Sequence, residues 1–124
     1  MSDLTDYAKN LLGRTLCARL PALPAQVFLA LGTGGSDATG LVGEPAGNGY
    51  ARQRVTFSGT GPQTNLDAVR FTFTAPSGTL THVGLFDAAS GGNPLTWSPL
   101  AQAATVSAAG TVTINPGTLV LTPS

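Results

Sequence analysis

The sequence predicts a mainly β fold: an antiparallel β-sandwich, jelly-roll-like or immunoglobulin-like, with one N-terminal α-helix. Short apolar or alternating segments recur after residue 25, separated by Gly, Pro, Asn and Asp, and this rhythm is typical of antiparallel sandwiches. Sixteen glycines and nine prolines in 124 residues supply turns, and seventeen threonines suit half-buried pleated strands. At this length we expect a single domain, residues 1–124, with the helix in residues 1–20 and the sandwich in residues 25–124.

The helix is predicted to run from Ser2 to about residue 20. Apolar residues recur there at three- and four-residue spacing, as they do along one face of a helix. Ser2 is the expected N-cap, and Asp3 and Asp6 fall in the first turn, where the helix dipole favours negative charge. The two prolines that follow are expected to end the helix. Such a helix either packs on the sheet of its own domain or forms an exposed docking helix.

The clearest strand signal is the strict alternation of residues 69–74, which predicts that Val69, Phe71 and Phe73 point inward. Near the C-terminus, Pro116 followed by Gly117 predicts a type II turn, because Gly accepts the positive φ at the third position. The other extended segments that we predict are residues 26–31, 50–58, 79–86, 95–106 (as two short pieces), 111–114 and 118–122.

Two further stretches have unusual composition. Residues 32–49 are predicted to form a long glycine-rich loop, and loops above about 12–15 residues are usually functional or mobile. Residues 88–124 contain no charged side chain in 37 positions. Solitary domains usually spread charge over their whole surface. We therefore expect neighbouring subunits to cover part of this uncharged stretch.

Charge and composition argue against several classes of protein. Six basic and six acidic residues cancel, which removes the electrostatic footprint of nucleic-acid binding. No run of about 18 apolar residues is present, so we expect no membrane insertion. One cysteine, Cys17, and one histidine, His82, exclude an intramolecular disulfide and cysteine-based or multi-histidine metal clusters. The acidic, polar N-terminus is unlike a signal peptide and favours assembly in a reducing cytoplasm.

Candidate catalytic residues are few. His82, Asp87 and Ser90 contain the residue types of a nucleophilic triad, but no nucleophile elbow is present and strand neighbours alternate faces. The acids of the glycine-rich loop, Asp37 and Glu44, match no calcium-loop spacing. We therefore predict no catalytic residue, no cofactor and no metal site.

Two segments resemble the signature blocks of a bacteriophage family. Residues 47–57 read Gly-Asn-Gly-Tyr-Ala-Arg-Gln-Arg-Val-Thr-Phe, and residues 80–95 read Leu-Thr-His-Val-Gly-Leu-Phe-Asp-Ala-Ala-Ser-Gly-Gly-Asn-Pro-Leu. This family comprises small virion proteins of tailed phages and prophages, usually labelled tail fibre-like or minor tail proteins. The N-terminal helix, the glycine-rich loop with an acid and the C-terminal strands also fit. The resemblance spans nearly the whole chain.

The blocks suggest structural roles for a few residues. Arg52 is expected to clamp a carboxylate, such as that of Glu44 or Asp67, through paired hydrogen bonds. Asp87 is expected to cap the turn between two adjacent strands. The interface residues that we predict belong to the helix and to the uncharged C-terminal stretch; they are Leu4, Leu11, Val120 and Leu121.

The resemblance implies a non-enzymatic structural component of a tailed phage virion, in the tail, neck or fibre-attachment region, assembled in the host cytoplasm. Its expected partners are copies of itself, in a ring, trimer or hexamer, and other phage structural proteins, with a host-surface receptor as a further candidate. Two alternatives stay open: a capsid decoration protein, and a receptor- or glycan-binding module at the tail tip with residues 32–49 as its tip. An enzyme that degrades cell-wall polymers needs a carboxylate pair or a metal-activated water, and the sequence offers neither convincingly.

Overall fold

The main sheet of the molecule has five antiparallel strands in the order β1-β10-β9-β2-β5. It is seen in a computed structural model that describes residues 3–19, 26–45, 47–59, 63–117 and 120–121. β2 and β9 lie at its centre and bury both of their faces, because Leu29, Ala30, Leu31 and Val83 are all 0–2% exposed. The strands are β1 (Asp3–Leu4), β2 (Val27–Gly32), β5 (Gln53–Val55), β9 (Gly78–Phe86) and β10 (Pro94–Val106).

A second layer packs on one face of this sheet. It consists of the pair β8 (Val69–Phe73) and β11 (Gly110–Ile114), and of a three-stranded sheet of β6 (Phe57–Ser58), β7 (Gln63–Asn65) and β12 (Val120–Leu121). The inward side chains of β8 are Val69, Phe71 and Phe73, as the alternation predicts, and they join one apolar core with the buried leucines of β2. The mainly β fold with one N-terminal helix is therefore confirmed.

The opposite face of the main sheet is covered by a hairpin of β3 (Gly34–Ser36) and β4 (Gly40–Val42). Leu41 of this hairpin packs with Ala30 and Phe86 in a second apolar cluster. The hairpin approaches β9 so closely that a Cβ at Gly84 would lie 2.9 Å from the Cβ of Leu41. The prediction of one long loop over residues 32–49 is thus wrong for its first half. A glycine-rich hairpin without an apolar alternation gives no strand signal, although its small residues allow this close packing.

The helix α1 (Asp6–Leu16) begins later than predicted. Its N-cap is Thr5 and not Ser2: the Thr5 Oγ1 accepts a hydrogen bond from the Ala8 N–H at 3.2 Å. Asp3 and Leu4 are extended and pair with Trp97 and Thr96 of β10. This long-range pairing holds the chain out of the helix, which local spacing cannot reveal. The helix ends at Leu16, and residue 20, the predicted limit, lies outside the described residues.

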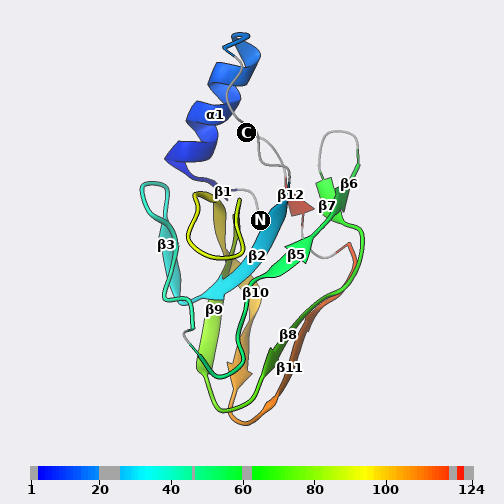
Figure 1. Ribbon diagram of the computed structural model, residues 1–124. Helices are drawn as coiled ribbons and strands as arrows, with labels where there is room; N and C mark the ends of the chain where they lie inside the picture. Colours follow the sequence, from blue (N-terminus) through cyan, green and yellow to red (C-terminus); the bar gives the residue numbers. More distant parts are fainter. Residues whose placement is uncertain (1–2, 20–25, 46, 60–62, 118–119, 122–124) are drawn as a thin grey trace.

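The remaining predicted segments all contain strands among the described residues, with different bounds. The segment 50–58 forms two strands, β5 and β6, and the segment 95–106 forms one strand whose register shifts between Pro99 and Ala104. The sequence analysis missed β7, because its three residues are polar. Gly117 has a φ of +76°, as the predicted turn requires. Figure 1 shows α1 at one end of the molecule and the β8–β11 pair at the other.

Candidate functional site

The first candidate site is the polar corner, which we define as Glu44, Tyr50 and Arg52 together with the β9–β10 turn. The Arg52 Nε donates to Glu44 Oε2 at 2.8 Å, and Nη2 donates to Oε1 at 2.9 Å. Glu44 Oε2 also accepts a hydrogen bond from the Tyr50 hydroxyl at 2.6 Å. The Tyr50 oxygen in turn accepts the Leu31 N–H at 3.1 Å. The corner therefore links the segment after β4 to the centre of the main sheet.

Arg52 also holds the turn between β9 and β10. Its Nη1 donates to the carbonyl oxygens of Ala88 at 3.0 Å and Gly91 at 2.8 Å. The guanidinium carbon lies 3.7 Å from the centroid of the Phe86 ring, a cation–π distance. The side chains of Arg52 and Glu44 are only 10% and 25% exposed, so their attraction is screened less than that of a surface pair.

The electrostatics of the polar corner keep its groups in their ordinary protonation states. The hydrogen bond to Glu44 raises the pKa of Arg52. Burial, with a further contribution from the hydrogen bond to Glu44, raises the pKa of Tyr50 far above its ordinary value. Tyr50 therefore stays a neutral donor and Arg52 stays a cation. This arrangement suits holding loops in place rather than transferring protons near neutral pH.

Asp87 lies at the start of the turn that Arg52 holds. Its Oδ1 accepts the Asn93 N–H at 2.7 Å, and its Oδ2 accepts the Asn93 side-chain amide at 3.1 Å. The structure thus brings Arg52 to Glu44, the first of the two carboxylates named from the sequence, and places Asp87 on the same turn. Asp67, the other carboxylate, lies in an exposed position after β7.

Two of the three candidate triad residues, His82 and Asp87, are directed to other partners. The His82 Nδ1 lies 2.8 Å from the Thr81 hydroxyl, and its ring stacks on Trp97 with centroids 6.3 Å apart. Asp87 is bonded to Asn93, as described above. In the described part of the chain, no three His, Cys, Asp or Glu residues gather closely enough to hold a metal ion. Nor does any described helix have the length and apolar character needed to span a membrane.

A second polar cluster, centred on Asp37 in the β3–β4 turn, was missed by the sequence analysis. Asp37 Oδ1 accepts the Trp97 indole N–H at 2.9 Å, and Oδ2 lies 3.1 Å from Lys9 Nζ. The Asp37 carbonyl accepts the Asp6 N–H at 2.7 Å. The hydrogen bonds from Trp97 and then from Lys9 hold the pKa of the Asp37 carboxyl below its ordinary value. These residues are far apart in sequence, so no local pattern could join them.

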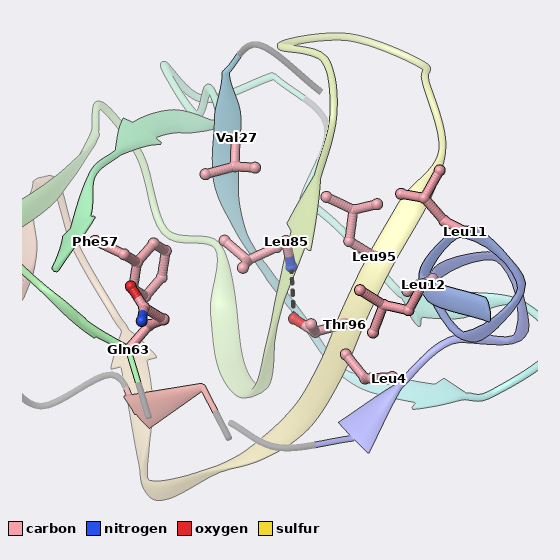
Figure 2. A pocket seen from close by; sticks show the side chains of 10 residues that line it. Leu4, Leu11, Leu12, Val27, Phe57, Gln63, Leu85, Leu95 and Thr96 are labelled. Atoms are coloured by element: carbon pink, nitrogen blue, oxygen red, sulfur yellow. Dashed lines mark hydrogen bonds between the residues drawn. The ribbon is translucent and has the colours of Figure 1, made fainter. Parts of the chain in front are cut away.

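The second candidate site is the apolar groove, a cavity of about 230 Å³ between α1 and one end of the sandwich. Figure 2 shows α1 on one side, with Val27 of β2 and Phe57 of β6 on the other. The Thr96 hydroxyl oxygen accepts the Leu85 N–H at 3.2 Å, so this polar group already has a partner. Carbon atoms dominate the lining, which consists of Leu4, Ala8, Leu11, Leu12, Val27, Phe57, Gln63, Leu85, Leu95 and Thr96.

The structure places two of the predicted interface residues in this groove. Leu4 and Leu11 are 7% and 8% exposed and form part of its wall. The apolar surface that reaches solvent comes instead from Leu12 and Leu16, which are 40% and 88% exposed and lie one helical turn apart. Two adjacent leucines, Leu11 and Leu12, cannot both face the sheet, because neighbouring helix positions point in different directions. This pair was the sequence signal that one leucine of the helix is exposed.

Val120 and Leu121, the other predicted interface residues, lie in β12. The backbone of β12 pairs with β7, with Val120 opposite Thr64 and Leu121 opposite Gln63. Their side chains lie outside the described part of the structure.

Comparison with known families adds the decisive observation. Residues 2–122 match the family described as podophage GP4 fiber I protein gp80. The chain belongs to this family. The predicted resemblance to tail fibre-like proteins of tailed phages is thereby confirmed. No curated protein matches the chain.

Membership in the podophage fiber I family makes the chain a structural, tail-fibre-like component of a virion. The match to this family includes every feature described above, from β1 through the polar corner to β12. The matched residues also contain both sequence blocks. Residues 47–57 include Tyr50 and Arg52, and residues 80–95 include the turn that Arg52 holds.

Proposed function

We propose that this fiber I family member is a non-enzymatic structural component of the tail, neck or fibre-attachment region, and that it assembles as a symmetric homo-oligomer. The observation that carries the proposal is the match of residues 2–122 to a phage fibre family. Its partners are copies of itself and other structural proteins of the particle, with assembly in the host cytoplasm.

The polar corner supports a non-enzymatic role. Its carboxylate accepts three hydrogen bonds from within the chain, two from Arg52 and one from Tyr50. A catalytic acid or base needs a pKa near the working pH and a free path to its substrate. Glu44 is held by these bonds and Tyr50 stays protonated, so both groups are suited to fixing the β9–β10 turn.

The apolar groove supports contact with other protein chains. Leu12 lines an open cavity of about 230 Å³, and Leu12 and Leu16, one helical turn apart, leave apolar surface in solvent. Contiguous exposed apolar surface is a mark of protein–protein contact. The uncharged stretch 88–124 is a further candidate contact region, because covering its exposed parts in an assembly leaves no charge without a partner.

The two alternatives have weaker support. A receptor-binding tip at residues 32–49 needs a segment that reaches away from the body. The hairpin in that segment is instead attached to the body by the bond from Trp97 to Asp37 and by the Asp6 N–H. A capsid decoration protein differs from a tail component in copy number, which can be measured.

The test is quantitative mass spectrometry of purified virions, with the major capsid protein and a known tail protein as internal standards. We expect a copy number near that of the tail or neck components. A count near that of the capsid protein favours head decoration, and absence from the particle contradicts the proposal. Binding of the purified protein to host cells, lost when residues 34–42 are shortened, favours the receptor-binding alternative.

A further inference from the structure

The edge of β11 lacks the usual protection of a sheet edge in the described chain. Natural edge strands avoid unwanted pairing by being short, by carrying charge or proline, or by bulging. The edge strands β1, β6 and β12 have two described residues each, and β5 has three with the exposed Arg54 among them. The side of β10 that extends beyond β1 carries Pro99 and a register shift. β11 has five residues, Gly-Thr-Val-Thr-Ile, without charge or proline. Its register with β8 runs without a shift from Gly110 to Ile114.

One side of β11 is without a backbone partner in the part of the chain that the structure describes. β8 is the one strand hydrogen-bonded to it, and the described turn and loop hydrogen bonds do not involve residues 110–114. Every second residue of an edge strand directs its N–H and C=O away from its neighbour. Within the described residues, β11 therefore presents a row of backbone donors and acceptors to which a further strand can bond.

The β8 strand beside it is placed differently. It carries the exposed Arg70, and the Thr74 N–H that follows β8 donates to the carbonyl of Asn48 at 2.8 Å. Charge and this neighbouring segment both hinder strand addition at β8. Of the two edges of the β8–β11 pair, only that of β11 combines full length with an uncharged sequence.

We propose that β11 is a strand-addition site for β11 of a second copy of this chain, paired antiparallel about a two-fold axis at Val112. The proposal rests on the proposed function and names the contact through which copies associate. A two-fold contact requires a self-complementary surface. In this register Thr111 lies opposite Thr113 of the partner subunit, and Val112 lies opposite Val112 of the partner subunit. Threonine pairs and β-branched pairs are favourable across antiparallel strands.

The neighbouring rows of side chains also fit this pairing. Arg70 lies beside Thr113 and Thr72 beside Thr111 within one chain. On the solvent face, a row of side chains across the four strands contains Arg70 and Thr113 of one copy, followed by Thr111 of the partner subunit and Thr72 of the partner subunit. The arginines of the two copies therefore do not lie in the same row. On the inner face Val112 and Ile114 are half-buried against the core and lose exposure when a strand is added. The result is a continuous four-stranded sheet across two copies.

The test uses two double variants at the same exposed positions. Thr111→Lys with Thr113→Lys places two lysine pairs across the axis, whereas Thr111→Glu with Thr113→Lys places two Glu–Lys pairs there. We expect the wild type and the Glu/Lys variant to self-associate in sedimentation velocity at low ionic strength. The Lys/Lys variant should associate roughly tenfold or more weakly, because each like-charge pair opposes pairing. Urea unfolding should show that both variants fold, since Thr111 and Thr113 are exposed.

Self-association of the Lys/Lys variant at wild-type strength overturns the proposal, as does a monomeric wild type or a monomeric Glu/Lys variant. The virion copy number separates this outcome from the proposed function. Wild-type protein present in particles, together with a Lys/Lys variant that still associates, leaves the virion role standing and excludes the β11 contact. Wild-type protein absent from particles contradicts the virion role whatever the sedimentation result.

Discussion

The polar corner and the apolar groove are built in opposite ways on one sandwich. In the corner, Arg52 bonds to Glu44 and to two carbonyl oxygens, so its donors have partners inside the chain. In the groove, carbon-rich walls leave a cavity of about 230 Å³ open and Leu12 40% exposed. The corner stabilises loops of its own chain. The groove leaves apolar area exposed to solvent, so the two regions differ in how completely the chain provides partners for its own side chains.

Removing Arg52 is the largest expected disturbance of the corner. Arg52→Ala leaves the half-buried Glu44 carboxylate without its cation and frees the β9–β10 turn, and we expect a loss of about 3 kcal/mol in the free energy of unfolding. Arg52→Lys should recover little of it, because an ammonium cannot form the forked pair with Glu44. The measurement is urea unfolding followed by fluorescence of Trp97.

The matched control is Arg54→Ala, which removes the same side chain from an exposed position of the same strand segment. It should change the free energy of unfolding by no more than about 0.5 kcal/mol. Equal losses from the two substitutions contradict the assignment of Arg52 as a clamp of the corner.

The packing of α1 at the groove can be tested by making the same Leu→Ala substitution at a buried and at an exposed position of the helix. Leu11→Ala removes a groove wall residue that is 8% exposed, and we expect it to cost about 2 kcal/mol. Leu16→Ala, at a residue 88% exposed, should cost no more than about 0.5 kcal/mol, since its side chain loses little contact. Chemical denaturation of both variants checks the difference. Similar costs at the two positions mean that α1 does not dock as described.

The smallest expected effect concerns the Asp37 cluster, which joins the hairpin to α1. Because the folded-state pKa of Asp37 lies below its unfolded value, its stabilisation is present above the unfolded pKa and is lost as pH falls through the folded pKa. The melting temperature of Asp37→Asn should therefore fall less than that of the wild type between about pH 5 and pH 2. Asp67→Asn controls for the loss of one negative charge. Identical pH profiles of wild type and Asp37→Asn contradict this expectation.

The sequence predicted those parts of the fold that local pattern determines. The alternation of Val69, Phe71 and Phe73 identified β8 and its inner face, and Pro116–Gly117 identified a turn. The helix start at Thr5 was missed, because it depends on pairing between β1 and β10, more than 89 residues away. The β3–β4 hairpin was missed because its packing on Trp97 depends on small glycines rather than on apolar alternation.

The contacts of the candidate site were likewise predicted from the sequence only in part. The pairing of Arg52 with a nearby acid was foreseen as a choice between Glu44 and Asp67, and the structure places Glu44 in contact. Tyr50 was not foreseen as a member of the corner, although it shares Glu44 with Arg52. The Asp37–Trp97 contact, at a separation of 60 residues, has no sequence signal at all. Long-range contacts of this kind depend on the finished sheet.

The anchoring of Thr5 has a consequence for the order of folding. Its N–H and hydroxyl bond to the carbonyl oxygens of Leu95 and Pro94, 90 and 89 residues further along the chain. The pairing of β1 therefore cannot form until β10 has been synthesised, whereas the N-cap bond between the Thr5 hydroxyl and the Ala8 N–H is local to the helix. The anchoring of the helix start to the sheet is thus the step that depends on β10. Contacts between such distant positions close slowly, because a long loop must be ordered first. We expect α1 to dock only after β10 has been synthesised, so that a nascent chain exposes the leucines of α1 until then.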